Sequence, residues 1–175
     1  MNSKDAYLKN IPELQQYLKD VDVNDTKTIE ADLSLREFLA GFFSYMPRWL
    51  MALFWVRGVV AKVLRLRHEG SLGNPQMRPE DVPMTPGESA TIFTTHAAKE
   101  EQYWVAHDSD SHLDFSLIVA KEPLDNTSRF YVATLVSYNN WKGRFYFAMI
   151  TPFHHLIVRQ MMKSAVKKER ALRGQ

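Results

Sequence analysis

The chain has 175 residues, of which 45% are hydrophobic and 24% charged, and its 22 basic and 20 acidic side chains leave a net charge of +2. This length and composition favour one folded domain with a sizeable core and argue against disorder. The small net charge argues against nucleic-acid binding. The absence of cysteine excludes disulfides, thiolate catalysis and cysteine metal sites, and it favours a reducing compartment, so we expect a cytoplasmic protein.

The N-terminus does not read as a signal peptide, because residues 1–9 are polar and of mixed charge. Residues 38–60 are the most hydrophobic stretch, but Pro47, Arg48 and Arg57 interrupt them. The longest apolar run in this stretch is well short of the roughly 20 residues that a bilayer crossing needs. We therefore expect buried helix here.

The chain begins with an expected helical extension over residues 1–25, broken at Pro12. Residues 26–33 predict a first strand. The pattern Ser34-Leu35-Arg36-Glu37 is a capping box, which predicts a helix beginning near Leu35. Pro47 should end or kink this helix, giving a pair of helices packed on a sheet.

The second helix of this pair is expected over residues 48–67. Residues 69–88 then carry four prolines and three glycines among polar residues, which predicts a loop. A loop of this length is either a surface connector or a mobile lid over a binding site.

Short runs of β-branched and aromatic residues fill most of the second half, and turn residues separate them. They predict strands over residues 90–98, 101–106, 112–120, 128–138 and 144–150. The short connections favour an antiparallel sheet. Alternation directs three sets of side chains toward one interior: Leu113, Phe115, Leu117 and Val119; Phe130, Val132, Val136 and Tyr138; Phe145, Phe147 and Met149.

The last predicted element is a long C-terminal helix that opens with Thr151 as N-cap and Pro152 at its first position. Its inward stripe is expected to comprise Phe153, Leu156, Ile157, Gln160, Met161, Ser164 and Ala165. The end of this helix is locally basic. It suits either a solvated helix end or a contact with an anionic membrane surface.

Three short motifs resemble one known superfamily: His112-Leu113-Asp114-Phe115, Gly143-Arg144-Phe145-Tyr146 and Pro152-Phe153-His154. Together with the order of elements, from about Ser34 onward, they resemble the START-like helix-grip (SRPBCC) superfamily. They resemble more closely a bacterial family within it that has no established activity. The resemblance implies one α+β domain over residues 1–175, with a curved antiparallel sheet around the C-terminal helix and an elongated cavity between them.

Several common chemistries lack their motifs. No phosphate-binding glycine loop and no G-x-S-x-G nucleophile elbow occurs. The segment from His107 to His112 is dense in ligand-type side chains, but it lacks the glycine and the distal glutamate of a calcium loop. We interpret it as a hairpin turn, and we expect no metal and no cofactor.

Three polar residues could carry chemistry. His154, near the expected helix start, should be a neutral imidazole, suited to proton transfer or to hydrogen bonding in a cavity, or else tied to the backbone or Asp114. Asp114 and Arg144 have the opposite strand parity to their apolar neighbours, so they are expected to leave the apolar face and form a structural polar cluster.

We therefore expect non-catalytic binding of a hydrophobic or amphipathic small molecule. The cavity-lining candidates are Phe115, Leu117, Phe130, Val132, Phe145, Phe147, Met149, Phe153, Ile157 and Met161. One alternative is an acid-base enzyme that uses His154 with Asp114. Another is an interaction module that contacts a protein or a membrane through the basic C-terminal helix. The ligand and the oligomeric state do not follow from the sequence.

Overall fold

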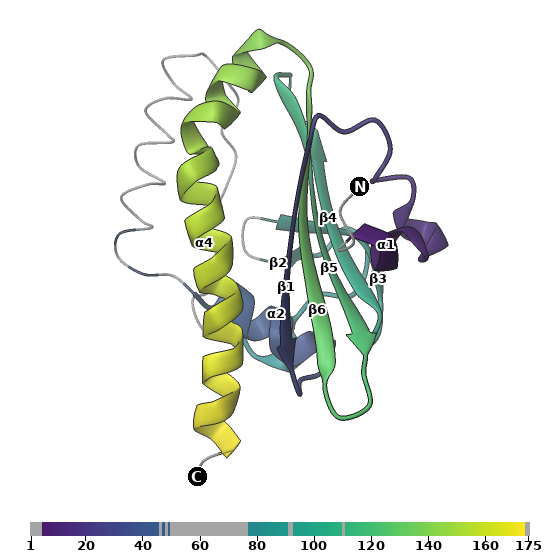
Figure 1. Ribbon diagram of the computed structural model, residues 1–175, viewed down its shortest axis with the longest axis vertical. Coiled ribbons are helices and arrows are strands. Elements are labelled where there is room, and N and C mark those ends of the chain that lie inside the picture. Colours follow the sequence, from purple (N-terminus) through teal and green to yellow (C-terminus); the bar gives the residue numbers. More distant parts are fainter. Residues whose placement is uncertain are drawn as a thin grey trace.

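The structure is a computed structural model that describes residues 5–45, 47, 49, 77–90, 93–109 and 111–173, with the backbone alone described for residues 5 and 168–173. Within these ranges the chain forms one curved antiparallel sheet. The longest helix, α4, lies along one face of this sheet, and the N-terminal segment packs against the other face (Figure 1). The described elements therefore form an α+β helix-grip arrangement, as predicted.

The sheet has six strands in the order β1-β6-β5-β4-β3-β2, and every neighbouring pair is antiparallel. Their bounds are β1 Val23–Ala31, β2 Ser89–Ala90, β3 Phe93–Lys99, β4 Tyr103–Ser109, β5 Leu113–Pro123 and β6 Ser128–Tyr138. The expected strand over residues 90–98 is divided between β2 and β3. The other four strands predicted before residue 140 are confirmed, with ends shifted by a few residues.

Helix α2, Leu35–Phe43, begins at the predicted capping box. The Ser34 hydroxyl accepts from the Glu37 amide, and the Glu37 carboxylate accepts from the Ser34 amide. The carboxylate of Glu101, from the β3–β4 turn, accepts a further hydrogen bond from the Leu35 amide at 2.9 Å. Three of the amides that a helix start leaves unpaired are thus satisfied. The second predicted helix, residues 48–67, lies almost wholly outside the described residues.

The described end of the predicted loop, residues 77–88, is held against the sheet and α2. It contains a short 3-10 helix, η2, at Pro79–Asp81. The Arg36 guanidinium donates to the Val82 carbonyl at 2.9 Å, and the Trp104 indole donates to the Pro83 carbonyl at 3.0 Å. Residues 69–76 of the predicted loop lie outside the described residues.

The N-terminal segment covers the sheet face opposite α4 (Figure 1). Helix α1, Asp5–Lys9, stops before Pro12, and the 3-10 helix η1, Pro12–Leu14, follows, as the predicted break implies. Leu8, Ile11 and Leu14 are buried in a second core with side chains from β4, β5 and β6. The sheet is therefore apolar on both faces, whereas the sequence pattern indicated a single interior.

Helix α4 runs from Trp141 to Arg173, so the predicted strand over residues 144–150 and the predicted helix start at Thr151-Pro152 are wrong. The Asn140 side-chain oxygen accepts from the amides of Lys142 at 3.0 Å and Gly143 at 3.4 Å, which is the geometry of an N-cap. This cap lies immediately after β6, and it starts the helix despite the aromatic, strand-like composition that follows. Pro152 is inside the helix.

The earlier start also changes which face of α4 is buried. Val158, Met162, Ala165 and Val166 face the core, whereas Phe153 and Leu156 are about half exposed. Of the predicted inward stripe, Ala165 is buried and Met161 packs partly against the core. None of the helices in the described ranges has the length and apolarity that a membrane crossing requires.

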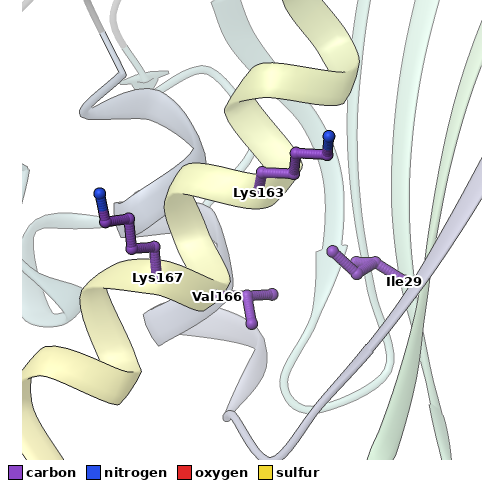
Figure 2. Close-up of a pocket in the computed structure, with 4 residues that line it drawn as sticks. All are labelled: Ile29, Lys163, Val166 and Lys167. Atoms are coloured by element: carbon purple, nitrogen blue, oxygen red, sulfur yellow. The ribbon is translucent and has the colours of Figure 1, made fainter.

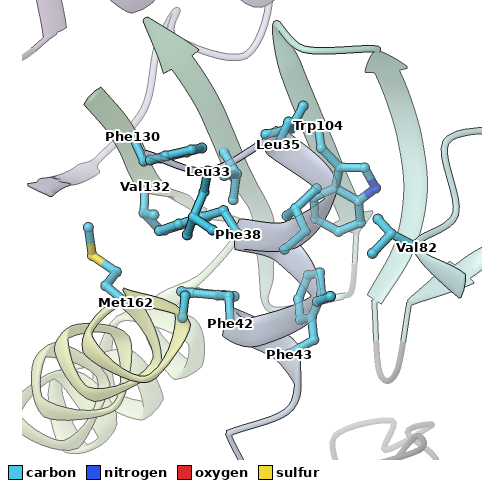
Figure 3. Close-up of a cluster of buried hydrophobic side chains, with 14 of the residues drawn as sticks. Leu33, Leu35, Phe38, Phe42, Phe43, Val82, Trp104, Phe130, Val132 and Met162 are labelled. Carbon is cyan, nitrogen blue, oxygen red and sulfur yellow. The ribbon is translucent and has the colours of Figure 1, made fainter. Parts of the chain in front are cut away.

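The main core lies between the sheet and the two helices α2 and α4 (Figure 3). Phe38 of α2 stacks on Phe130 of β6, with ring centroids 4.2 Å apart. Gly41 of α2 lies so close to α4 that an added Cβ would be 2.7 Å from the Ala165 Cα atom. Helix α2 therefore fixes the C-terminal half of α4 at its distance from the sheet.

Candidate functional site

The predicted cavity-lining residues divide into two groups. Leu117, Phe130, Val132 and Phe147 are buried, and Phe115 and Met161 pack partly against the core. Phe145, Met149 and Phe153 are 45% to 52% exposed, and Ile157 is partly buried. Phe145 and Met149 were assigned inward because residues 144–150 were expected to form a strand, and Phe153 because it was assigned to the inward stripe of a helix starting at Thr151. In the helix they lie on the solvent side.

Asp114 and Arg144 make separate contacts at the start of β5 and of α4. The Asp114 carboxylate accepts from the Ser109 hydroxyl at 2.5 Å and from the Asn139 side-chain NH2 group at 3.1 Å. The Arg144 guanidinium lies over the Tyr138 ring, 5.7 Å from its centroid. Both residues take part in polar contacts between strand ends and the helix start, but the structure pairs neither of them with His154.

His154 lies near Asp25 on β1 and not near Asp114. Four polar residues meet where β1 faces α4, and we call them the polar tetrad: Asp25, Lys27, His154 and His155. The Lys27 ammonium is paired with the Asp25 carboxylate. That carboxylate lies 2.9 Å from His155 Nδ1 and 3.8 Å from His154 Nε2. Asp25, Lys27 and His154 expose 11% to 18% of their side chains, whereas His155 exposes 45%.

Burial sets the protonation of this cluster. Burial lowers the pKa of His154 to about 4, further helped by the positive charge of Lys27 and only partly opposed by Asp25. Burial alone would raise the pKa of Asp25, but the hydrogen bond and charge of Lys27 outweigh it, so this pKa lies below its ordinary value. Near neutral pH the cluster therefore holds one ion pair and a neutral His154.

A fifth polar group adjoins the polar tetrad from the sheet. Thr134 of β6 is the register partner of Asp25, and its side chain is fully buried. Its hydroxyl oxygen and His154 Nε2 both lack a hydrogen-bond partner within the described part of the chain. Buried polar groups without partners are rare in folded proteins, so each requires an explanation. Here one belongs to the register partner of Asp25, and the other lies 3.8 Å from the Asp25 carboxylate.

Where β1 and α4 face each other, they also form an open pocket of about 250 Å³. Ile29 of β1 lies opposite Val166 and Lys163 of α4, and Lys167 completes the lining (Figure 2). The side chains thus give one apolar wall on each element and two ammonium groups. A pocket of this size takes only part of a typical ligand.

The described residues do not assemble a metal site from three or more histidine, aspartate or glutamate side chains. In the polar tetrad, the Lys27 ammonium already neutralises the carboxylate that a cation would need. Among the described residues between His107 and His112, His107 forms a hydrogen bond with the Ser116 hydroxyl at 2.9 Å.

The sequence interpretation missed Asp25 and Lys27, although a signal was present. Both have the same strand parity as Ile29 and Ala31, which belong to the main core, so two charges alternate into the apolar face of β1. Charges at inward positions need a partner, and two adjacent histidines on the last helix were the candidates. The rotation of α4 about its own axis, which decides which histidine faces β1, could not be predicted from the sequence.

Taken together, the antiparallel sheet, the long C-terminal helix and the polar groups between them define a helix-grip domain with an interior polar site. The chain belongs to the family described as Protein of unknown function (DUF2867), whose model matches residues 17–161. The comparisons with curated proteins and with solved structures returned no match.

Proposed function

We propose that the protein is a non-catalytic binder of an amphipathic small molecule, held between the sheet and α4. The observation that carries this proposal is the pair of unpartnered buried atoms beside Asp25, the Thr134 hydroxyl and His154 Nε2. A polar group of a ligand placed there would satisfy both. We further propose that the family belongs to the START-like helix-grip superfamily, supported by the order of strands and the long C-terminal helix, and that the protein is cytoplasmic, supported by its lack of cysteine.

The surroundings favour a ligand with an apolar body. Leu117 is the register partner of Thr134 on β5, and Phe115 and Val136 form the next row on the same face. Binding sites for small molecules combine such apolar walls with a few convergent polar groups. The unpartnered atoms would orient the ligand, and the apolar contacts would supply most of the affinity.

The charges favour an uncharged head group. Asp25 and Lys27 neutralise one another, and His154 is neutral because burial lowers its pKa to about 4. A buried ligand charge would have no counter-ion left in the polar tetrad, and burying an unpaired charge is costly. An alcohol or a carbonyl group can bond to the Thr134 hydroxyl and the imidazole without this cost.

The geometry argues against an acid-base dyad of His154 with Asp25, whose carboxylate lies within hydrogen-bond reach of His155 Nδ1 instead, at 2.9 Å. A working dyad needs base and orienting carboxylate within hydrogen-bond reach, whereas the Asp25 carboxylate lies 3.8 Å from His154 Nε2 and is neutralised by Lys27. The enzyme hypothesis survives in a changed form, with Asp25 in the place expected for Asp114. Turnover of a bound alcohol or carbonyl compound that His154→Gln abolishes would support it over simple binding.

The test compares decanol with decanoate, which share a chain and differ in head-group charge. We expect decanol to raise the melting temperature of the protein more than decanoate does. Thr134→Val should weaken decanol binding by about tenfold, because it removes one buried hydrogen bond to the ligand. Equal binding by the two compounds, or no binding by either, would contradict the proposal.

A matched control and a second measurement complete the test. The control is Thr94→Val, which changes an exposed threonine on β3 and should leave decanol binding unchanged. Native mass spectrometry of the protein as purified should also detect a co-purified apolar compound. A protein that is reproducibly empty and does not respond to either probe would exclude the binding function.

A further inference from the structure

The outward face of α4 carries an unusual sequence of side chains. Five large apolar residues, which we call the apolar stripe, are 45% to 70% exposed: Trp141, Phe145, Met149, Phe153 and Leu156. Their spacing of three and four residues places them on one side of the helix. Large exposed apolar patches on a folded protein mark contact with a partner or a membrane.

The same outward side changes character after Leu156. Arg159, Lys163 and Lys167 continue it at four-residue steps, and all three are exposed. Residues 141–167 contain five basic side chains and no aspartate or glutamate, in a chain that is otherwise rich in acidic residues. The outward face of α4 is thus apolar in its first half and cationic in its second.

The charges on this face indicate what kind of partner it binds. A helix with exposed aromatic residues and only cationic charges suits the boundary of an anionic bilayer, where the apolar side chains enter the headgroup region and the cations meet lipid phosphates. A second copy of this face would bring like charges together. We propose that the protein docks on anionic lipid membranes through the outward face of α4.

The buried core residues of α4 lie on its inward side, whereas Lys163 and Lys167 of the cationic half also line the pocket beside Ile29, at the rim between α4 and β1. The N-terminal segment lies on the far side of the sheet and would face away from the lipid (Figure 1). The proposal does not depend on the small-molecule binding proposed above, and either can fail without the other.

The experiment is flotation of the full chain with two kinds of vesicle, phosphatidylcholine alone and equimolar phosphatidylcholine and phosphatidylglycerol. We expect flotation with the anionic vesicles only, weakened by added salt. The emission of Trp141 should shift to shorter wavelength on binding, and Trp141→Phe should remove that shift. Flotation with neither vesicle, or equally with both, would overturn the proposal.

Two variants test the two halves of the face. Phe145→Ser combined with Phe153→Ser should weaken anionic-vesicle binding by about tenfold or more, because two apolar side chains leave the interface. Arg159→Glu should weaken it by at least about fivefold. Its matched control is Lys19→Glu, which makes the same charge change at an exposed position of the N-terminal segment and should bind like the unchanged chain.

Melting temperature and elution volume separate this proposal from its rivals. Both should match those of the unchanged chain in the stripe variant. A strong fall in melting temperature would show that the apolar stripe is packed within the folded protein. A concentration-dependent dimer that the stripe variant abolishes would show that a second copy covers it. Either result would overturn membrane docking, and Arg159→Glu tests the cationic half of the face separately.

Discussion

His154 couples the polar tetrad to the stability of the fold. Burial lowers its pKa to about 4 from the ordinary 6.5, so the unfolded chain takes up a proton between these values and the folded chain does not. Stability should therefore fall as pH falls through this window, by about 2 kcal/mol between pH 7 and pH 5 from this residue alone. Urea unfolding at the two pH values measures the change.

The comparison with His154→Gln isolates this residue from the other histidines. Glutamine does not titrate, so the variant should lose less stability between pH 7 and pH 5 than the unchanged chain does. Asp25 does not interfere, because its pKa is lowered and its contribution is lost only at more acidic pH. Identical pH profiles for the two proteins would show that His154 is not buried as a neutral imidazole.

At the scale of a single element, the start of α4 depends on one side chain. Asn140 caps the helix and also donates to the Ser111 carbonyl at 2.8 Å, which ties the cap to the β4–β5 turn. Asn140→Ala should reduce the free energy of unfolding by about 1 kcal/mol, the usual cost of losing an N-cap. Hydrogen exchange should also accelerate at the Lys142 and Gly143 amides. Asn126→Ala, at an exposed turn position, serves as the control.

This element also shows how far the sequence can predict the structure. The capping box at Ser34 and the strand β6 followed from local patterns, because cap and alternation signals are read within a few residues. Residues 144–150 could not be assigned locally. Their aromatic side chains fit a strand by composition, and the helix depends on the Asn140 cap and on contact with the β4–β5 turn, where a Cβ on Gly143 would be 2.0 Å from the His112 carbonyl.

The site depended on that same assignment. Leu117, Phe130 and Val132 are buried on the face that alternation predicted, because alternation in β5 and β6 is regular. The carboxylate near His154 was not predicted, since pairing a strand near the N-terminus with a helix near the C-terminus depends on tertiary packing. Asp25 and His154 meet only because β1 pairs with β6 at the sheet edge that α4 crosses.

For the whole molecule, the position of α4 follows from its contact with α2. An added Cβ on Gly41 would lie 2.7 Å from the Ala165 Cα and 3.1 Å from its Cβ. In an isolated helix, Gly41→Ala would stabilise by about 1 kcal/mol. Here we expect a net loss of about 1 to 3 kcal/mol on urea unfolding, because α4 must move away from α2.

The double variant Gly41→Ala with Ala165→Gly tests whether backbone or side chain sets this distance. The closest atom to the added Cβ belongs to the α4 backbone, so removing the Ala165 methyl group should not restore stability. Displacement of α4 should also weaken decanol binding, because the polar tetrad is assembled across the β1–α4 seam. Full recovery of stability in the double variant would show that only the side chains set the distance between α2 and α4. Full recovery of decanol binding would show that α4 can shift against β1 without disturbing the polar tetrad.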